Sequence, residues 1–138
     1  MTKLLFNAAA TLSFVFGVQV NCAATEAVTA ESVAGVYEST RAPGFPFPGT
    51  DTVTLSKDGS FRLDLALSRG KIATFLGTWT YSDRMVFVVT TERLLDGKPN
   101  PPTNPSGWKP GHEMNMPIKG NKLFRSETSD EPFTKVSE

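Results

Sequence analysis

The chain has 138 residues, with 14 lysines and arginines, 14 aspartates and glutamates, and a formal net charge of +0 at pH 7. This length fits one domain, and the balanced charge gives no reason to expect nucleic acid as a partner. Hydrophobic residues make up 39% of the chain, which argues against wholesale disorder, and 11 glycines with 10 prolines favour strands and turns over a helical bundle.

The N-terminus has the three-part pattern of a secretory signal peptide. Lys3 supplies a positive charge, a nearly apolar run follows, and small residues precede a cleavage point after Ala24. We therefore predict a signal peptide at 1–24 and a single β-barrel domain at 25–138. The protein is then periplasmic or secreted, with no integral membrane span after cleavage. Lipid anchoring through Cys22 is the alternative.

Alternating apolar and polar residues bounded by turn residues predict eight short strands in the mature chain. They cover residues 32–39, 52–56, 61–67, 71–81, 85–91, 112–118, 123–125 and 133–136. Gly77 in the middle of the fourth strand predicts a bulge or a sharp bend. No stretch has a helical period over three turns, although residues 25–34 have room for one short helical turn.

Hairpins joined in simple succession favour an all-β fold, a single small antiparallel up-and-down barrel of about eight strands. An open β-sandwich of the same strands is the alternative.

Two long loops, 41–50 and 92–111, are expected at the same end of such a barrel, because alternate connections share an end. Both are rich in proline, and they carry Phe45, Phe47 and Trp108. Proline lowers the entropy that a loop loses on binding, and aromatic side chains bury large apolar areas. We expect a binding site at this end, unless these side chains fold back and complete the core.

Few residues have the pattern of a catalytic site. His112 is the only histidine, and no Gly-x-Ser-x-Gly elbow is present to offer a nucleophile beside it. No spacing selects a pair of carboxylates from Asp51, Asp64 and the other acids, which lie beside turns and are expected to be solvated. Phosphate loops, dinucleotide fingerprints and zinc motifs are also absent from the sequence. We therefore expect neither catalysis nor a cofactor.

One alternative involves copper. His112, Met114 and Met116 share one face of a strand, and imidazole with thioethers suits Cu(I). Trp108, four residues earlier, is placed to lie against such a cation. The set is similar to the His, Met, Met and Trp residues of small periplasmic copper chaperones with five-stranded barrels. The other interpretation is an ordinary inward row of a half-buried strand, in which methionine fills gaps.

A wider set of short motifs resembles bacterial lipocalin-like domains, which are small exported barrels. The motifs are a Gly-x-Tyr strand start, an Asp-Gly-Ser-Phe hairpin, a Gly-Thr-Trp strand and a closing strand, at residues 34–37, 57–61, 76–79 and 133–136. The resemblance implies the barrel, a location in the envelope and binding in place of catalysis. It implies no catalytic residue.

The leading hypothesis is an exported, non-enzymatic binding module for a small apolar or amphipathic molecule. Phe45, Phe47 and Trp108 are expected at the entrance, with Met114 and Met116 deeper. One alternative is an interaction factor of the inhibitor, immunity or assembly type, which binds another envelope or secreted protein through the same loops. The other is a periplasmic Cu(I) carrier, which uses the histidine and the two methionines named above.

Overall fold

The structure is a computed structural model that describes residues 28–41, 47–103 and 107–138. The predicted signal peptide, Cys22 and Phe45 lie outside the described residues. The described part contains a short helix α1 (Ala30–Val33), a 3-10 helix η1 (Ser68–Gly70) and nine strands. The strands are β1 (Gly35–Thr40), β2 (Thr50–Leu55), β3 (Ser60–Ala66), β4 (Ile72–Ser82), β5 (Met85–Leu95), β6 (Lys98–Pro99), β7 (His112–Lys119), β8 (Lys122–Phe124) and β9 (Pro132–Ser137).

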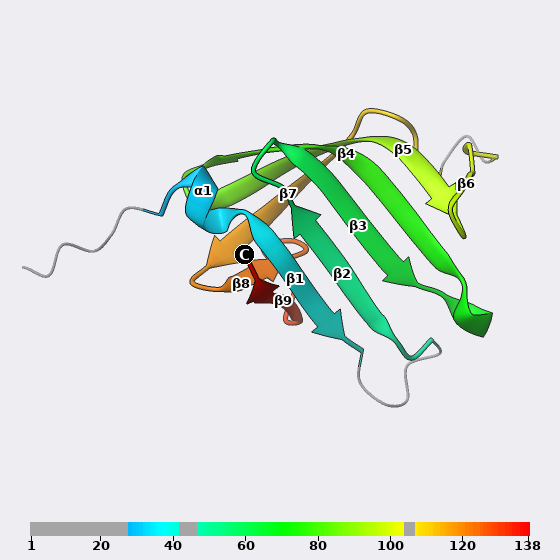
Figure 1. The fold of residues 1–138 in the computed structure, drawn as a ribbon, viewed down its shortest axis with the longest axis horizontal. Coiled ribbons are helices and arrows are strands. Elements are labelled where there is room, and N and C mark those ends of the chain that lie inside the picture. Colours follow the sequence, from blue (N-terminus) through cyan, green and yellow to red (C-terminus); the bar gives the residue numbers. More distant parts are fainter. Residues whose placement is uncertain (1–27, 42–46, 104–106) are drawn as a thin grey trace, which may run out of the picture.

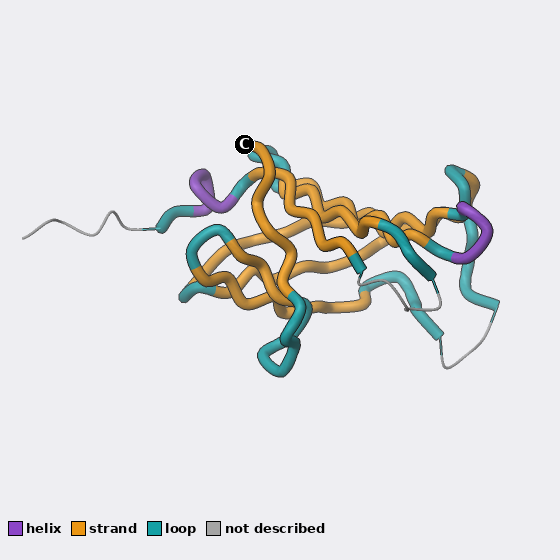
Figure 2. The backbone as a smooth tube through the Cα atoms, turned by 90° about the horizontal axis from the view of Figure 1, so that it is seen from below, coloured by secondary structure: helices purple, strands orange, loops and turns teal. Residues whose placement is uncertain are grey.

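Eight of these strands form a closed antiparallel barrel (Figures 1 and 2). The sheet has the order β4-β3-β2-β1-β9-β8-β7-β5, and a further pairing between β4 and β5 closes it. The short strand β6 adds to the edge of β5 outside this ring. The predicted up-and-down barrel is confirmed, and the closing pair distinguishes it from the open sandwich.

The core of the barrel follows from the alternation along each strand. On β3, Phe61 is buried and points inward, whereas Arg62 is exposed. Most buried apolar side chains form one cluster. The cluster comprises Val33, Ala34, Tyr37, Val53, Leu55, Phe61, Trp79, Val86, Val88, Met116, Ile118, Leu123 and Phe133. Many of these residues lie toward the end of the barrel where α1 and the tight turns are found.

Helix α1 covers one end of the barrel, where a strand was predicted from residue 32. Thr29 and Ser32 form a capping box that starts the helix. Val33 then packs into the core with 1% of its surface exposed, and its carbonyl accepts a hydrogen bond of 2.5 Å from the Tyr37 hydroxyl. Burial raises the pKa of Tyr37 to about 12. The predicted start of the first strand is therefore wrong, because local capping favours a helical turn there.

Gly77 allows β4 and β5 to approach closely at a bulge. The register shifts between Leu76 and Gly77, and Thr91 is the extra residue on β5. A Cβ atom at position 77 would lie 2.0 Å from the carbonyl oxygen of Val89, which is far inside contact distance. The predicted bulge is confirmed, and it explains why only glycine fits at this position.

The same bulge changes the end of β5. The loop predicted at 92–111 begins too early, because β5 continues to Leu95 and pairs Arg93 with Phe75. The extra residue Thr91 shifts which face the later side chains take, so the predicted strand ends at residue 91 although β5 continues to Leu95. Asp96 and Gly97 have φ values of 49° and 75° and turn the chain into β6.

The end of β1, the start of β2, the end of β5 and the start of β7 lie at one end of the barrel, opposite α1, so the predicted sharing of one end by the two long connections is confirmed. Figure 2 shows α1 at one end of the barrel and η1 at the other. We call the end with α1 the helix end and the other the loop end. Within the described ranges, no helix has the length and apolarity needed to cross a membrane.

Candidate functional site

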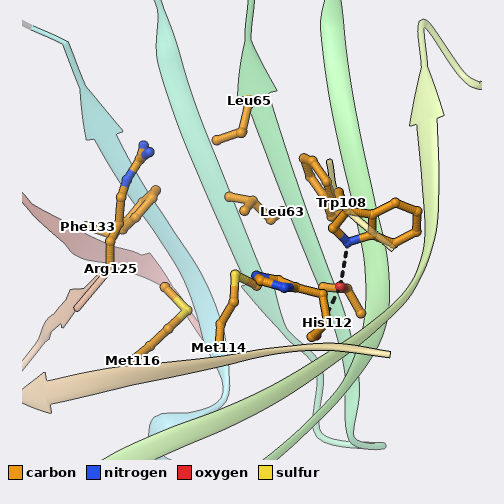
Figure 3. Close-up of a pocket in the computed structure, with 10 residues that line it drawn as sticks. Leu63, Leu65, Trp108, His112, Met114, Met116, Arg125 and Phe133 are labelled. Atoms are coloured by element: carbon orange, nitrogen blue, oxygen red, sulfur yellow. Dashed lines mark hydrogen bonds between the residues drawn. The ribbon is translucent and has the colours of Figure 1, made fainter. Parts of the chain in front are cut away.

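A cavity of about 270 Å³ lies at the loop end of the barrel (Figure 3). The side chains that line it come from β3, β4, β5, β7 and β9 and from two segments beside them. They are Leu63, Leu65, Phe75, Thr90, Trp108, His112, Met114, Met116, Arg125 and Phe133. Most of this wall is apolar, because it is built from the inward rows of the strands.

The wall of the cavity is packed less completely than the core. Leu63, Leu65 and Phe75 are only partly buried, although they belong to the inward rows of β3 and β4. Further along β3, toward the helix end, Phe61 on the same row is 2% exposed. The inward rows therefore leave space at one end of the barrel and fill it at the other.

Trp108 is fixed in the wall by polar and aromatic contacts. Its Nε1 donates a hydrogen bond of 2.8 Å to the hydroxyl of Thr90, which in turn donates to the carbonyl of His112 at 3.2 Å. The indole meets the Phe75 ring edge-to-face at a centroid distance of 5.8 Å. The guanidinium of Arg93 lies 5.7 Å from the Phe75 centroid. Trp108 thus closes part of the cavity and does not project from the loop.

The predicted row of His112, Met114 and Met116 lies on β7 and lines the same cavity. His112, Met114 and Met116 all contribute to the wall (Figure 3). Met116 is 2% exposed and belongs to the core, whereas His112 is exposed. Among the described residues, no group of three or more His, Cys, Asp or Glu side chains is placed to hold a metal ion. A copper site would therefore depend on the methionine sulfur atoms, and it stays a prediction.

The other predicted site residues are placed differently. Phe47 lies at the loop end, but it does not line the cavity, and 40% of its surface is exposed. Its carbonyl accepts a hydrogen bond of 3.1 Å from Nη1 of Arg41. The structure thus brings together Trp108, Met114 and Met116 and leaves Phe47 outside this group.

The sequence prediction missed a buried ionic cluster beside the cavity. The Asp51 side chain is 0% exposed, although acids beside turns were expected to be solvated. Arg41 binds it through Nη2 at 2.7 Å and 2.9 Å and through Nε at 3.2 Å. Arg125 binds it through Nη2, and the amide of Ala66 donates to it at 3.0 Å. The expectation is wrong because Asp51 lies on the inward row of β2 with Val53.

Comparisons with known proteins do not assign the chain to a group. No protein-family model, curated protein or solved structure matches it. The resemblance to lipocalin-like domains therefore stays a prediction from short motifs.

Proposed function

We propose that this protein is an exported, non-enzymatic binding module that takes a small apolar or amphipathic molecule into the loop end of its barrel. The apolar cavity of about 270 Å³ is the observation that carries the proposal. Ligand pockets are concave, mainly apolar and of roughly 300–1,000 Å³, with a few polar groups that fix orientation. This cavity lies just below that range, which supports a small ligand. The signal-peptide pattern at 1–24 supports export.

The arrangement of the aromatic side chains favours a small molecule over a protein partner. An interaction surface of the predicted kind needs Phe47 and Trp108 to project together as anchors. Trp108 is instead held against Thr90 and Phe75 in the cavity wall. Of these two aromatic side chains only Phe47 is exposed, so the predicted pair of anchors is not presented to a partner protein.

Cu(I) transport is the second candidate, because His112, Met114 and Met116 line one cavity. Alternate residues of a strand lie roughly 7 Å apart along the chain, so the three side chains would have to converge on one ion. Titration with Cu(I) of the wild type and of a Met114→Ala, Met116→Ala variant tests this function. Equal affinity in the two proteins would remove the methionines from any copper site.

Tryptophan emission tests the proposed function, because the two tryptophans lie at different places. In a Trp79→Phe variant, Trp108 is the only tryptophan left, and its emission should change on titration with 1-octanol or medium-chain fatty acids. In the matched Trp108→Phe variant, Trp79 reports from the core near α1 and should respond little. An unchanged Trp108 emission, together with no thermal stabilisation of the wild type by these probes, would contradict the proposal.

A further inference from the structure

A cluster of three charged side chains at the loop end of the barrel carries one positive charge more than its buried carboxylate neutralises. Asp51 is the single carboxylate of the cluster, and two guanidinium groups, those of Arg41 and Arg125, bind it. Arginine stays protonated in proteins, so the cluster has a net charge of +1. Among the described residues that line the cavity, none is acidic. An anionic ligand in the cavity would neutralise this excess positive charge.

The two arginines differ in how many of their hydrogen-bond donors are already used. Arg41 is 16% exposed and uses Nε, Nη1 and Nη2 on Asp51 and Phe47. Arg125 is 47% exposed and lines the cavity. Within the described residues it donates to Asp51 through Nη2 alone, so the other donors of its guanidinium make no hydrogen bond there. Arg125 is therefore the residue that can take a further acceptor.

The contacts of Arg125 also hold its side chain in place before any ligand binds. Asp51 fixes one side of the guanidinium, and the carbon atom at its centre lies 5.0 Å from the centroid of the Phe133 ring. A side chain that is already ordered loses little entropy on binding, which raises affinity. Arg125 thus has the charge, the spare donors and the rigidity of an anion-binding group.

The position of Arg125 relative to the apolar wall defines the shape of the ligand. In Figure 3, the Arg125 guanidinium lies beside Phe133 on the side of the cavity where Leu65 is found. Met114 and Met116 lie farther from Leu65, on the opposite side of the view. A molecule with a charged head group at Arg125 can therefore place an apolar chain against the methionines. The net charge of +1 matches a head group with one negative charge, and a guanidinium binds a carboxylate with particularly good geometry.

We infer that the cavity binds a small amphipathic monocarboxylate, whose carboxylate is held by Arg125 and whose apolar chain lies against Leu63, Met114 and Met116. This inference rests on the proposed binding function and narrows it to one ligand class. The cavity volume of about 270 Å³ favours short or medium chains over long ones.

The experiment compares octanoate with 1-octanol, which has the same chain length and no charge, by calorimetric titration of the wild type and three variants, Arg125→Gln, Arg125→Lys and Arg62→Gln. Arg125→Gln should weaken octanoate binding about 10- to 100-fold, the usual value of a charge-assisted hydrogen bond. It should change octanol binding less than about threefold. Arg125→Gln should fold, because Asp51 keeps Arg41 and the Ala66 amide, and unchanged octanol binding reports that fold.

Arg62→Gln is the matched control. Arg62 is 54% exposed and pairs with Asp64, much as Arg125 pairs with Asp51, but it lies on the outer face of β3. Its substitution should leave both affinities unchanged.

The outcomes separate this inference from the proposed function. If the wild type binds octanol but not octanoate, or if Arg125→Gln weakens both probes equally or neither, the monocarboxylate inference is overturned and the binding function stands. If the wild type binds neither probe, both are overturned. Selective loss of octanoate in Arg125→Gln, with partial recovery in Arg125→Lys, supports the inference.

Discussion

The two ends of the barrel are built from the same strands, yet one is filled and the other is hollow. At the helix end, the inward rows carry large apolar side chains such as Tyr37, Phe61 and Leu123, and α1 lies over them. At the loop end, the same rows carry Asp51 and lead into Arg125. Charged groups cannot pack as an apolar core: Asp51 is buried only with hydrogen-bond donors around it, and Arg125 keeps 47% of its side chain exposed. The comparison shows that residue type along one row decides where a small barrel stays open.

The comparison also explains how stability is divided between the two ends. The helix end is stabilised by burial of apolar surface, which is lost when a side chain is shortened. At the loop end, burying the cluster of Asp51, Arg41 and Arg125 costs desolvation free energy. Removing one member destabilises the protein further, because it leaves a charge without its partner. The two ends should therefore respond to different substitutions.

The largest expected effect is at the helix end. Leu123 is 0% exposed, so Leu123→Ala should lower the free energy of unfolding by about 4 kcal/mol through lost burial and a new cavity. Leu65→Ala, at the cavity wall, should cost about 1 kcal/mol because a space already adjoins that side chain. Urea unfolding of both variants measures the difference, and equal losses would show that the two ends are packed alike.

The next effect concerns the ion cluster at the loop end. Asp51→Asn should destabilise the protein by about 3 kcal/mol, because Arg41 and Arg125 then face each other without a counter-charge. Asp64→Asn is the matched control. Asp64 pairs with Arg62 on the outer face of β3 and also accepts a hydrogen bond from the Thr74 hydroxyl, and ion pairs on an outer face contribute about 1 kcal/mol or less. The same urea experiment compares them, and a small loss in Asp51→Asn would mean that the cluster is dispensable.

The smallest effect is a pH dependence at the helix end. The pKa of Tyr37 is raised from 10.0 to about 12 in the folded protein. Between these values the unfolded chain loses this proton before the folded one does. The free energy of unfolding therefore falls as the pH rises from about 10 toward 12. Tyr37→Phe should cost about 1 kcal/mol at pH 7 for the lost hydrogen bond to Val33.

This variant should also flatten the alkaline decline in stability. Chemical unfolding at several pH values between 9 and 12 measures the decline. An equally steep decline in Tyr37→Phe and in the wild type would assign it to other groups.

The fold could be predicted from the sequence because the period of two survives in most strands. The row Phe61, Leu63 and Leu65 and the bulge at Gly77 were both readable from spacing alone. The continuation of β5 to Leu95 could not be read, because the extra residue at the bulge shifts the alternation. The short helix α1 lies within residues 25–34, where one helical turn was expected, but the capping hydrogen bonds that set its bounds give no helical period in the sequence.

The candidate site was predictable only in part. The order of the connections predicted Trp108 at one end, and alternation along the strand predicted Met114 and Met116 on one face. The structure brings the three side chains to one cavity. The pairing of Asp51 with Arg125 joins residues 74 positions apart, and it depends on the sheet order, in which β1 and β9 lie between β2 and β8. One signal was available: Asp51 shares the row of Val53 and Leu55, which is an unusual place for an acid.

The most direct test of the central claim, that ligands enter the loop end, is methyl NMR of the methionines during titration with octanoate. Met114 and Met116 line the cavity, whereas Met85 begins β5 at the helix end. We predict that the methyl signals of Met114 and Met116 shift with octanoate concentration while that of Met85 does not. A shift of Met85 as large as theirs, or constant signals from all three, would contradict the account.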